Sequence, residues 1–330
     1  MPIPPRSDLV NVLEYEDAAK ATLPSNVLAR IAGGDRAPFD RMTLRHRIMA
    51  PTTDLDLTVA LFGDTIAAPI IVGPIADQRR FHTEAELATA RGVASAKTIM
   101  VVSAEPSASL DDIIKTSAAP IWAQVFATAL NAKDAVAHAT AARCRAVCLT
   151  VRAGASASAR APVPPSVPIP WSVVGDLIHA TSVPVIVKGI MSVEDAREAV
   201  EHGAKGLIVS SYQGGPSTTG VPPILSLGAI VEAVDDRVPV MVDGSFRRGT
   251  DVVKALALGA RAVLVGRPVM WGLAAYGADG VQGVVEMLQT ELARYMCMCG
   301  KATLAELAPD VVRLHAVRAP RPATRTTTRG

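Results

Sequence analysis

The chain has 330 residues, of which 49% are hydrophobic, and a formal net charge of +2. This size and composition indicate a globular protein with one large domain or two small ones, and the scattered arginines form no stripe suited to nucleic acid. No apolar run reaches the roughly 18 residues that cross a bilayer and no apolar leader opens the chain, so we expect a cytoplasmic protein with neither a nucleic-acid nor a membrane partner.

Residues 1–68 precede the first expected strand and are predicted to form a helical cap. Within them, residues 11–20 open on Asn11, a residue type that favours the position before a helix, and continue as a helical pattern. At the other end of the chain, residues 311–330 are rich in arginine and lack apolar periodicity. We expect a disordered tail there, with an anion-binding arm as the alternative.

Eight short β-branched apolar runs occupy the middle of the chain, and amphipathic stretches such as residues 192–202 separate them. The runs cover residues 69–74, 98–103, 121–125, 146–151, 183–188, 206–210, 238–243 and 262–266. Continuous apolar strands that alternate with helices are typical of strands covered on both faces. The pattern predicts a closed (β/α)8 TIM barrel over residues 69–310, and an open doubly wound sheet is the weaker alternative.

Chemistry in such barrels lies where the strands end. The ends are mostly polar or small and comprise Pro74, Ile75, Ala76, Ser103, Gln124, Thr150, Lys188, Ser210, Asp243, Gly244, Gly266 and Arg267. A lysine at the end of a buried strand is costly unless an acceptor or an anion meets it, although a solvated lysine is the alternative for Lys188.

The last two units suggest an anion site. Glycine, Arg247, Arg248 and a helix start follow Asp243, and Arg267 follows the eighth strand. Loops after strands seven and eight are the usual phosphate site of this fold, where backbone N–H groups and arginine supply the donors. We infer a phosphate monoester, and the polar groups on the other strands favour an extended planar cofactor.

The stretches 187–189, 243–260 and 265–269 resemble the FMN-dependent α-hydroxy acid oxidase and dehydrogenase family of glycolate oxidase type, and the similarity extends from about Val10 to Leu307. The resemblance implies FMN as cofactor, with backbone of residues 74–76 near flavin N5 and Lys188 near its N1 to C2 edge. The hydroxyl and amide groups of Ser103, Gln124, Thr150 and Ser210 would bind the ring or ribityl chain. Asp243 would hold ribityl hydroxyls, and the phosphate would meet Gly244, Ser245, Arg247, Gly266 and Arg267.

The substrate half departs from the family pattern. Tyr212 stands where the family has its histidine base, and the family arginine three positions further on falls on Gly215 or Pro216. Other family positions differ as well: a tyrosine becomes Arg30, another becomes Phe126, the aspartate that orients the histidine becomes Arg152, and an aromatic residue becomes Glu105. One family arginine is retained as Arg160, in a register that is ambiguous by one residue.

Residues 161–170 replace the family's long lid with a short proline-rich linker, which leaves the flavin edge open to O2 or to a bulky substrate. Free tyrosine titrates near pH 10 and is a poor base at neutral pH unless a cation such as Arg152, Arg160 or Arg30 lies nearby. We therefore expect an FMN-dependent oxidase, dehydrogenase or monooxygenase that acts on a small anionic carboxylate or amino-acid-like substrate, rather than an ordinary 2-hydroxy acid oxidase.

Two alternatives remain: a redox-neutral FMN-dependent isomerase, and a flavin-binding protein whose catalytic half has decayed. No pair of histidines has metal-ligand spacing, so no metal is expected. The resemblance also implies a homo-oligomer, as a tetramer, and bacterial specialised metabolism is the expected setting.

Overall fold

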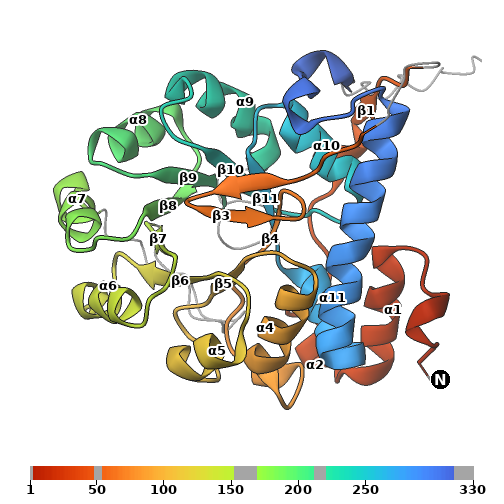
Figure 1. Ribbon diagram of the computed structural model, residues 1–330, viewed down its shortest axis with the longest axis horizontal. Helices are drawn as coiled ribbons and strands as arrows, with labels where there is room; N and C mark the ends of the chain where they lie inside the picture. Colours follow the sequence, from red (N-terminus) through yellow and green to blue (C-terminus); the bar gives the residue numbers. More distant parts are fainter. Residues whose placement is uncertain (1–2, 48–53, 152–168, 212–220, 316–330) are drawn as a thin grey trace, which may run out of the picture.

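The computed structural model describes residues 3–47, 54–151, 169–211 and 221–315. Eight parallel strands close into a barrel in the order β10-β11-β4-β5-β6-β7-β8-β9 (Figure 1). The strands are β4 (Ile70–Val72), β5 (Met100–Val102), β6 (Ile121–Phe126), β7 (Ala146–Thr150), β8 (Val185–Ile190), β9 (Gly206–Val209), β10 (Val240–Asp243) and β11 (Ala262–Val265). Each lies within or overlaps one of the eight predicted runs, so the predicted TIM barrel is confirmed over the open sheet.

Helices follow the strands and cover the outside of the barrel (Figure 1). They are α4 (Ala85–Ser95), α5 (Leu110–Thr116), α6 (Ala132–Ala141), α7 (Trp171–His179), α8 (Val193–Glu201), α9 (Pro223–Val234), α10 (Gly249–Ala257) and α11 (Arg267–Met298). The Ser192 hydroxyl accepts a hydrogen bond from the backbone N–H of Asp195, so the predicted cap of α8 is confirmed.

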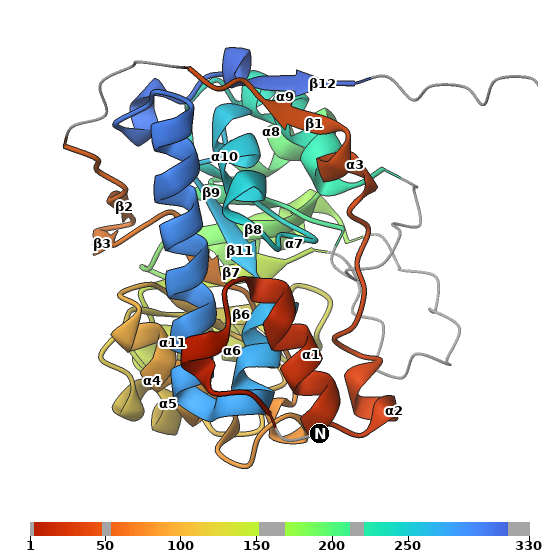
Figure 2. The same ribbon diagram turned by 90° about the vertical axis from the view of Figure 1, so that its right-hand side faces the viewer.

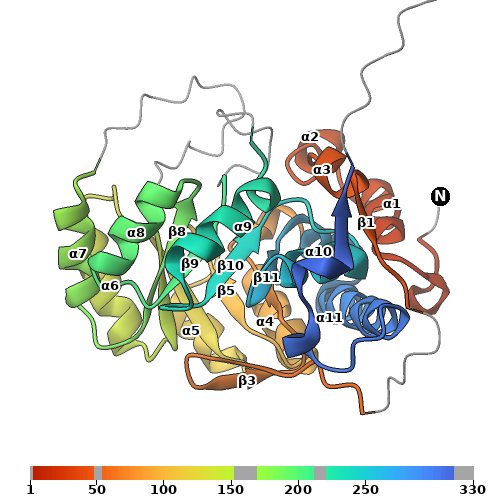
Figure 3. The same cartoon turned by 90° about the horizontal axis from the view of Figure 1, so that it is seen from above.

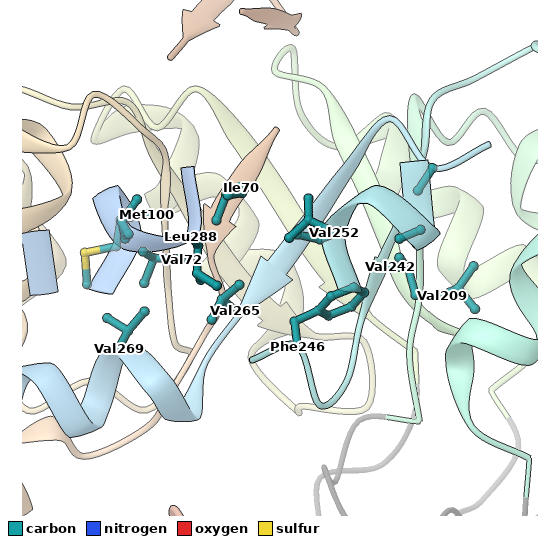
Figure 4. Packing of buried hydrophobic residues seen from close by; sticks show 14 of the residues in the cluster. Ile70, Val72, Met100, Val209, Val242, Phe246, Val252, Val265, Val269 and Leu288 are labelled. Carbon is teal, nitrogen blue, oxygen red and sulfur yellow. The ribbon is translucent and has the colours of Figure 1, made fainter. Parts of the chain in front are cut away.

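Alternation along the strands separates two apolar layers. On β4, Ile70 and Val72 pack outward against the helices, whereas Ile71 belongs to the layer inside the barrel. Figure 4 shows the outer layer, in which Val265 of β11 lies beside Val269 and Leu288 of α11. Because both faces are buried, each strand is apolar along its length, which is why continuous apolar runs identified the strands.

The hairpin of β2 (Val59–Leu61) and β3 (Asp64–Ile66) covers one end of the barrel interior. Its Val59, Leu61 and Ile66 pack with the inner layer, and the Phe62 ring meets Trp122 edge-on at 5.5 Å between centroids. Trp122 lies two residues before Gln124 on the same face of β6. The apolar floor is therefore at this end, and polar groups occupy the opposite end, where the strands finish.

The N-terminal segment contains short strands as well as the predicted helices. It comprises the 3-10 turn Arg6–Asp8, α1 (Val12–Thr22), α2 (Ser25–Leu28), α3 (Ala37–Asp40) and β1 (Met42–Leu44), besides the hairpin. The predicted helix after Asn11 is confirmed as α1, which packs along α11 (Figure 2). No helix in the described ranges is long and apolar enough to cross a membrane.

The expectation that residues 311–330 form a disordered tail is wrong for its first residues, 311–314, which have regular structure. After α11, two 3-10 turns (Leu304–Glu306 and Pro309–Val311) lead into β12 (Val312–Leu314), which pairs antiparallel with β1. The backbone of β1 supplies the hydrogen-bond partners for β12, and such pairing between segments about 270 residues apart leaves no local sequence pattern. Residues 316–330 lie outside the described ranges.

Candidate functional site

A layer of polar side chains lies above the inner apolar layer at the strand ends. Since side chains alternate, the residue two positions after each inner apolar residue faces inward as well. This register places Gln124 above Trp122, Lys188 above Ile186 and Asp243 above Met241. The same alternation places Ser103, Thr150 and Ser210 on that face, so the predicted strand-end groups gather at one end of the barrel.

One half of this layer is a hydrogen-bonded network over β5, β6 and β7. The Gln124 side-chain amide donates to Thr150 Oγ1 at 2.9 Å, and Gln124 Oε1 accepts from the backbone N–H of Ala104 at 3.3 Å and from Ser103 Oγ at 3.5 Å. Ser103, Gln124 and Thr150 are all buried. These hydrogen bonds fix the orientation of the Gln124 side chain, with Nε2 toward Thr150 and Oε1 toward Ser103 and Ala104.

The other half centres on Lys188, which is 2% exposed. Its Nζ donates to Asp243 Oδ2 and to Ser210 Oγ, both at 2.6 Å. Gly189, at φ +106°, accompanies a register shift between Lys188 and Ile190, a bulge that lets the strand bend beside the lysine. The alternative of a solvated lysine is therefore wrong, and the layer contains a buried cation paired with the Asp243 carboxylate.

A cavity with about 660 Å³ of empty space, partly open to solvent, lies between these groups and the ends of β10 and β11. Its lining comprises Gly73, Pro74, Ile75, Lys188, Ser211, Asp243, Gly244, Ser245, Phe246, Arg247, Leu264, Val265, Gly266 and Arg267. Nine of these are predicted cofactor residues. The lining does not include the other five, Ala76, Ser103, Gln124, Thr150 and Ser210.

A buried guanidinium group, that of Arg247, and a partly buried one, that of Arg267, meet at one end of the cavity. Arg247 donates to the carbonyl oxygens of Phe246 and Gly33, at 2.8 and 2.7 Å, and stacks 4.6 Å from the centroid of the Trp271 ring. Burial, and after it the positive charges of Arg267 and Arg36, lower the pKa of Arg247 to about 9, and burial lowers that of Arg267. Both positive charges are thus disfavoured where they stand, and an anion between them would offset that cost.

The N-terminal segment forms one wall of this end, a contribution that sequence reasoning missed. Arg36 pairs bidentately with the fully buried Asp251, at 2.8 and 3.1 Å, and donates to the Ser245 carbonyl at 2.9 Å. A Cβ on Gly34 would lie 2.9 Å from both Arg267 Nη2 and Ser245 Oγ. Figure 3 shows the segment around α2 and α3 beside α10. The adjacent glycines, Gly33 and Gly34, were the available sequence signal.

The two helix starts near the arginines differ in what they can still bind. Backbone N–H groups at the start of α10 donate to carboxylates within the protein: those of Arg247 and Arg248 to Asp251, and that of Gly249 to Glu291. The start of α11 has Gly266 as its N-cap, which has no side chain to accept such bonds. Pro268 has no N–H and the N–H of Val269 donates to the Gly266 carbonyl oxygen at 2.9 Å, so the N–H of Arg267 is the helical donor left for an anion. A phosphate is therefore better placed at α11, next to Arg267.

These features fit FMN. The paired guanidinium groups and the uncapped α11 start match a phosphate monoester, Asp243 is an acceptor for ribityl hydroxyl groups, and the polar layer suits a heteroaromatic ring. The individual contacts of the cofactor residues stay predictions.

Ser245 offers a test of the phosphate end. It is not a glycine, yet it has φ +61°, a left-handed conformation that costs about 1–2 kcal/mol for such a residue. We expect Ser245→Gly to raise the unfolding free energy of the apoprotein by about 0.5–1 kcal/mol, after the entropy of glycine is offset, and to weaken FMN binding a few-fold. Urea denaturation and FMN titration measure the two effects. Ser245→Ala should weaken FMN binding equally without a gain in stability; equal stability of both variants would contradict the strain.

The predicted catalytic residues are only partly described. Arg30 lies on an exposed turn after α2, and its role stays a prediction. Tyr212, Arg152 and Arg160 lie outside the described ranges. All six histidines of the chain fall within those ranges, and none of them lines the cavity. Ser211 lines it and is followed directly by Tyr212.

Comparison with known proteins agrees with this geometry. The family model for FMN-dependent dehydrogenase matches residues 31–161 and 155–314. Glycolate oxidase of Spinacia oleracea is 35% identical over 91% of this chain and 95% of its own length. 4-Hydroxymandelate oxidase of Amycolatopsis orientalis is 35% identical over 88% of this chain and 94% of its own length. L-lactate oxidase of Nostoc sp. is 32% identical over 93% of this chain and 99% of its own length. A crystal structure of mandelate oxidase with (S)-4-hydroxymandelic acid superposes with a TM-score of 0.86 at 33% identity, covering 94% of this chain and all of that one.

Proposed function

Because the chain belongs to the FMN-dependent dehydrogenase family, we propose that this FMN-dependent oxidoreductase converts a small 2-hydroxy acid to the corresponding 2-oxo acid. One observation carries the cofactor half of the proposal: the ion pair of the buried Lys188 with Asp243 and the two guanidinium groups of Arg247 and Arg267 lie along a single cavity. The substrate class is supported by the relatives, which by name oxidise glycolate, 4-hydroxymandelate and L-lactate.

This proposal revises the expectation drawn from the sequence. The departures at Tyr212, Arg152 and Arg30 favoured a substrate other than an ordinary 2-hydroxy acid, whereas the relatives point to ordinary hydroxy acids. The same relatives are oxidases, which favours oxidation over the redox-neutral isomerase and supports O2 as the final acceptor. A homo-oligomer and a cytoplasmic location remain predictions.

Bound FMN would supply the acceptor for two electrons from the α-carbon of the substrate. The protein's own task is electrostatic: the fixed charge of Lys188, held by Asp243 and Ser210, would favour negative charge at the adjacent cofactor edge. We propose that Tyr212 accepts the hydroxyl proton and that Arg160 and Arg152 bind the substrate carboxylate. Arg30 is the weaker candidate for the carboxylate because its side chain is exposed.

Anaerobic mixing tests the substrate class. We expect glycolate, lactate or mandelate to bleach the flavin absorbance near 450 nm, within about seconds to minutes given a weak base, and L-amino acids and primary amines to leave it unchanged. Stopped-flow spectra of the FMN-loaded protein give the rates. Bleaching by L-amino acids but not by hydroxy acids would favour the amino-acid-like substrate expected from the sequence, and a bound flavin that no compound bleaches would favour a decayed site.

A further inference from the structure

A buried polar cluster lies on the outer side of the loops that follow β4 and β5. It consists of Gln78, Glu86 and Thr89, which are 1%, 0% and 0% exposed. Glu86 and Thr89 belong to α4, and none of the three lines the cavity. Burial of polar groups is costly unless hydrogen bonds compensate, so the contacts of this cluster indicate what it holds.

Glu86 joins the two loops. Its Oε1 accepts hydrogen bonds from the backbone N–H of Gln78, after β4, at 3.2 Å and from that of Ser107, after β5, at 3.0 Å. Its Oε2 is buried, and the described residues give it no hydrogen-bond partner. Both hydrogen bonds of this carboxylate thus hold the backbone of loops at the rim of the site.

Thr89 and Gln78 extend this support to the cavity lining. Thr89 Oγ1 donates to Gln78 Oε1 at 2.6 Å, and Gln78 Nε2 donates to the carbonyl oxygen of Ile75 at 3.3 Å. Ile75 lines the cavity, and its carbonyl belongs to the same peptide unit as the N–H of Ala76. In a trans peptide these two groups point in opposite directions, so holding the carbonyl toward Gln78 turns the Ala76 N–H away from it. That N–H has no acceptor among the described residues.

We propose that Gln78, Glu86 and Thr89 are positioning residues that orient the Ala76 N–H as a hydrogen-bond donor to the flavin. The cluster thereby raises FMN affinity and the flavin's midpoint potential, because an N–H donor favours negative charge on the bound ring. This inference rests on FMN binding and is independent of which substrate is oxidised.

Thr89→Val removes the hydroxyl that holds Gln78 and leaves the cavity lining unaltered. We expect FMN to bind about 5- to 10-fold more weakly in titrations of the apoprotein, the effect of one lost hydrogen bond. If the reduced flavin loses about tenfold more affinity than the oxidised flavin, the midpoint potential falls by about 30 mV. Thr89→Ser, which keeps the hydroxyl, should restore both values.

Thr98→Val is the matched control. Thr98 is also fully buried, and its hydroxyl donates to the carbonyl of Ile70, at the other end of β4. Thr98→Val should lower the unfolding temperature as Thr89→Val does, and it should leave FMN affinity and the midpoint potential of the flavin unchanged. Equal affinity and potential in Thr89→Val and wild type would overturn the inference even if hydroxy acids are oxidised. A fall in FMN affinity and midpoint potential in Thr89→Val but not in Thr98→Val supports the inference even if hydroxy acids are not oxidised.

Discussion

Turnover of a 2-hydroxy acid at pH 7 is expected to rise about 10- to 100-fold when Tyr212 is replaced by histidine. Free tyrosine has a pKa near 10, so only about one part in a thousand is ionised at pH 7, whereas histidine, near 6.5, is mostly neutral and ready to accept a proton. General-base catalysis contributes roughly 10²- to 10⁴-fold to the rate. Because little of the tyrosine is ionised at pH 7, its ionised fraction limits this contribution in the wild type.

The pH profile gives the same comparison in a second form. A base acts only when deprotonated, so kcat/KM of the wild type should rise about tenfold per pH unit from pH 7 toward 9 and continue toward 10. With Tyr212→His it should level off above about pH 7. Steady-state assays across this range measure both curves. Tyr212→Phe is the control and should lose the rise; an unchanged profile in Tyr212→Phe would exclude Tyr212 as the proton acceptor.

Loss of the Arg267 guanidinium group should nearly abolish FMN binding without unfolding the protein. In Arg267→Leu we expect FMN affinity to fall about 100- to 1000-fold, because charge-assisted hydrogen bonds to phosphate are worth roughly 1.5–3 kcal/mol each. The apoprotein should be as stable as the wild type or more so, since the positive charge of Arg267 disfavours that of Arg247. FMN titration and thermal unfolding of the apoprotein separate the two effects.

Arg248→Leu is the control on the same loop. The Arg248 guanidinium contacts Glu291, whose side chain is 7% exposed, rather than the cavity. Its loss leaves that carboxylate without its cation and should cost about 1–2 kcal/mol of stability while changing FMN affinity less than twofold. If Arg267→Leu instead destabilises the apoprotein and retains FMN, the arginine is structural and the phosphate binds elsewhere.

The candidate site was predictable to the extent that strand ends are visible in a sequence. Lys188 and Asp243 each close an apolar run, and the closure of the barrel brings them within 2.6 Å although 55 positions separate them. Arg36 and Glu86 were missed because neither closes a strand: one lies in the N-terminal segment and the other in α4, and both act on loops that only the folded chain places beside them.

The sequence by itself determined the eight strands, their order along the chain and the polar character of their ends, because a continuous apolar run and the alternation of side chains along a strand are local properties. Only the tertiary structure decided that Lys188 is buried against Asp243, that Arg36 binds Asp251, and that residues 312–314 form a strand with 42–44. These pairings depend on distances between segments far apart in the chain, and burial of a charge is decided by the partner that such a contact supplies.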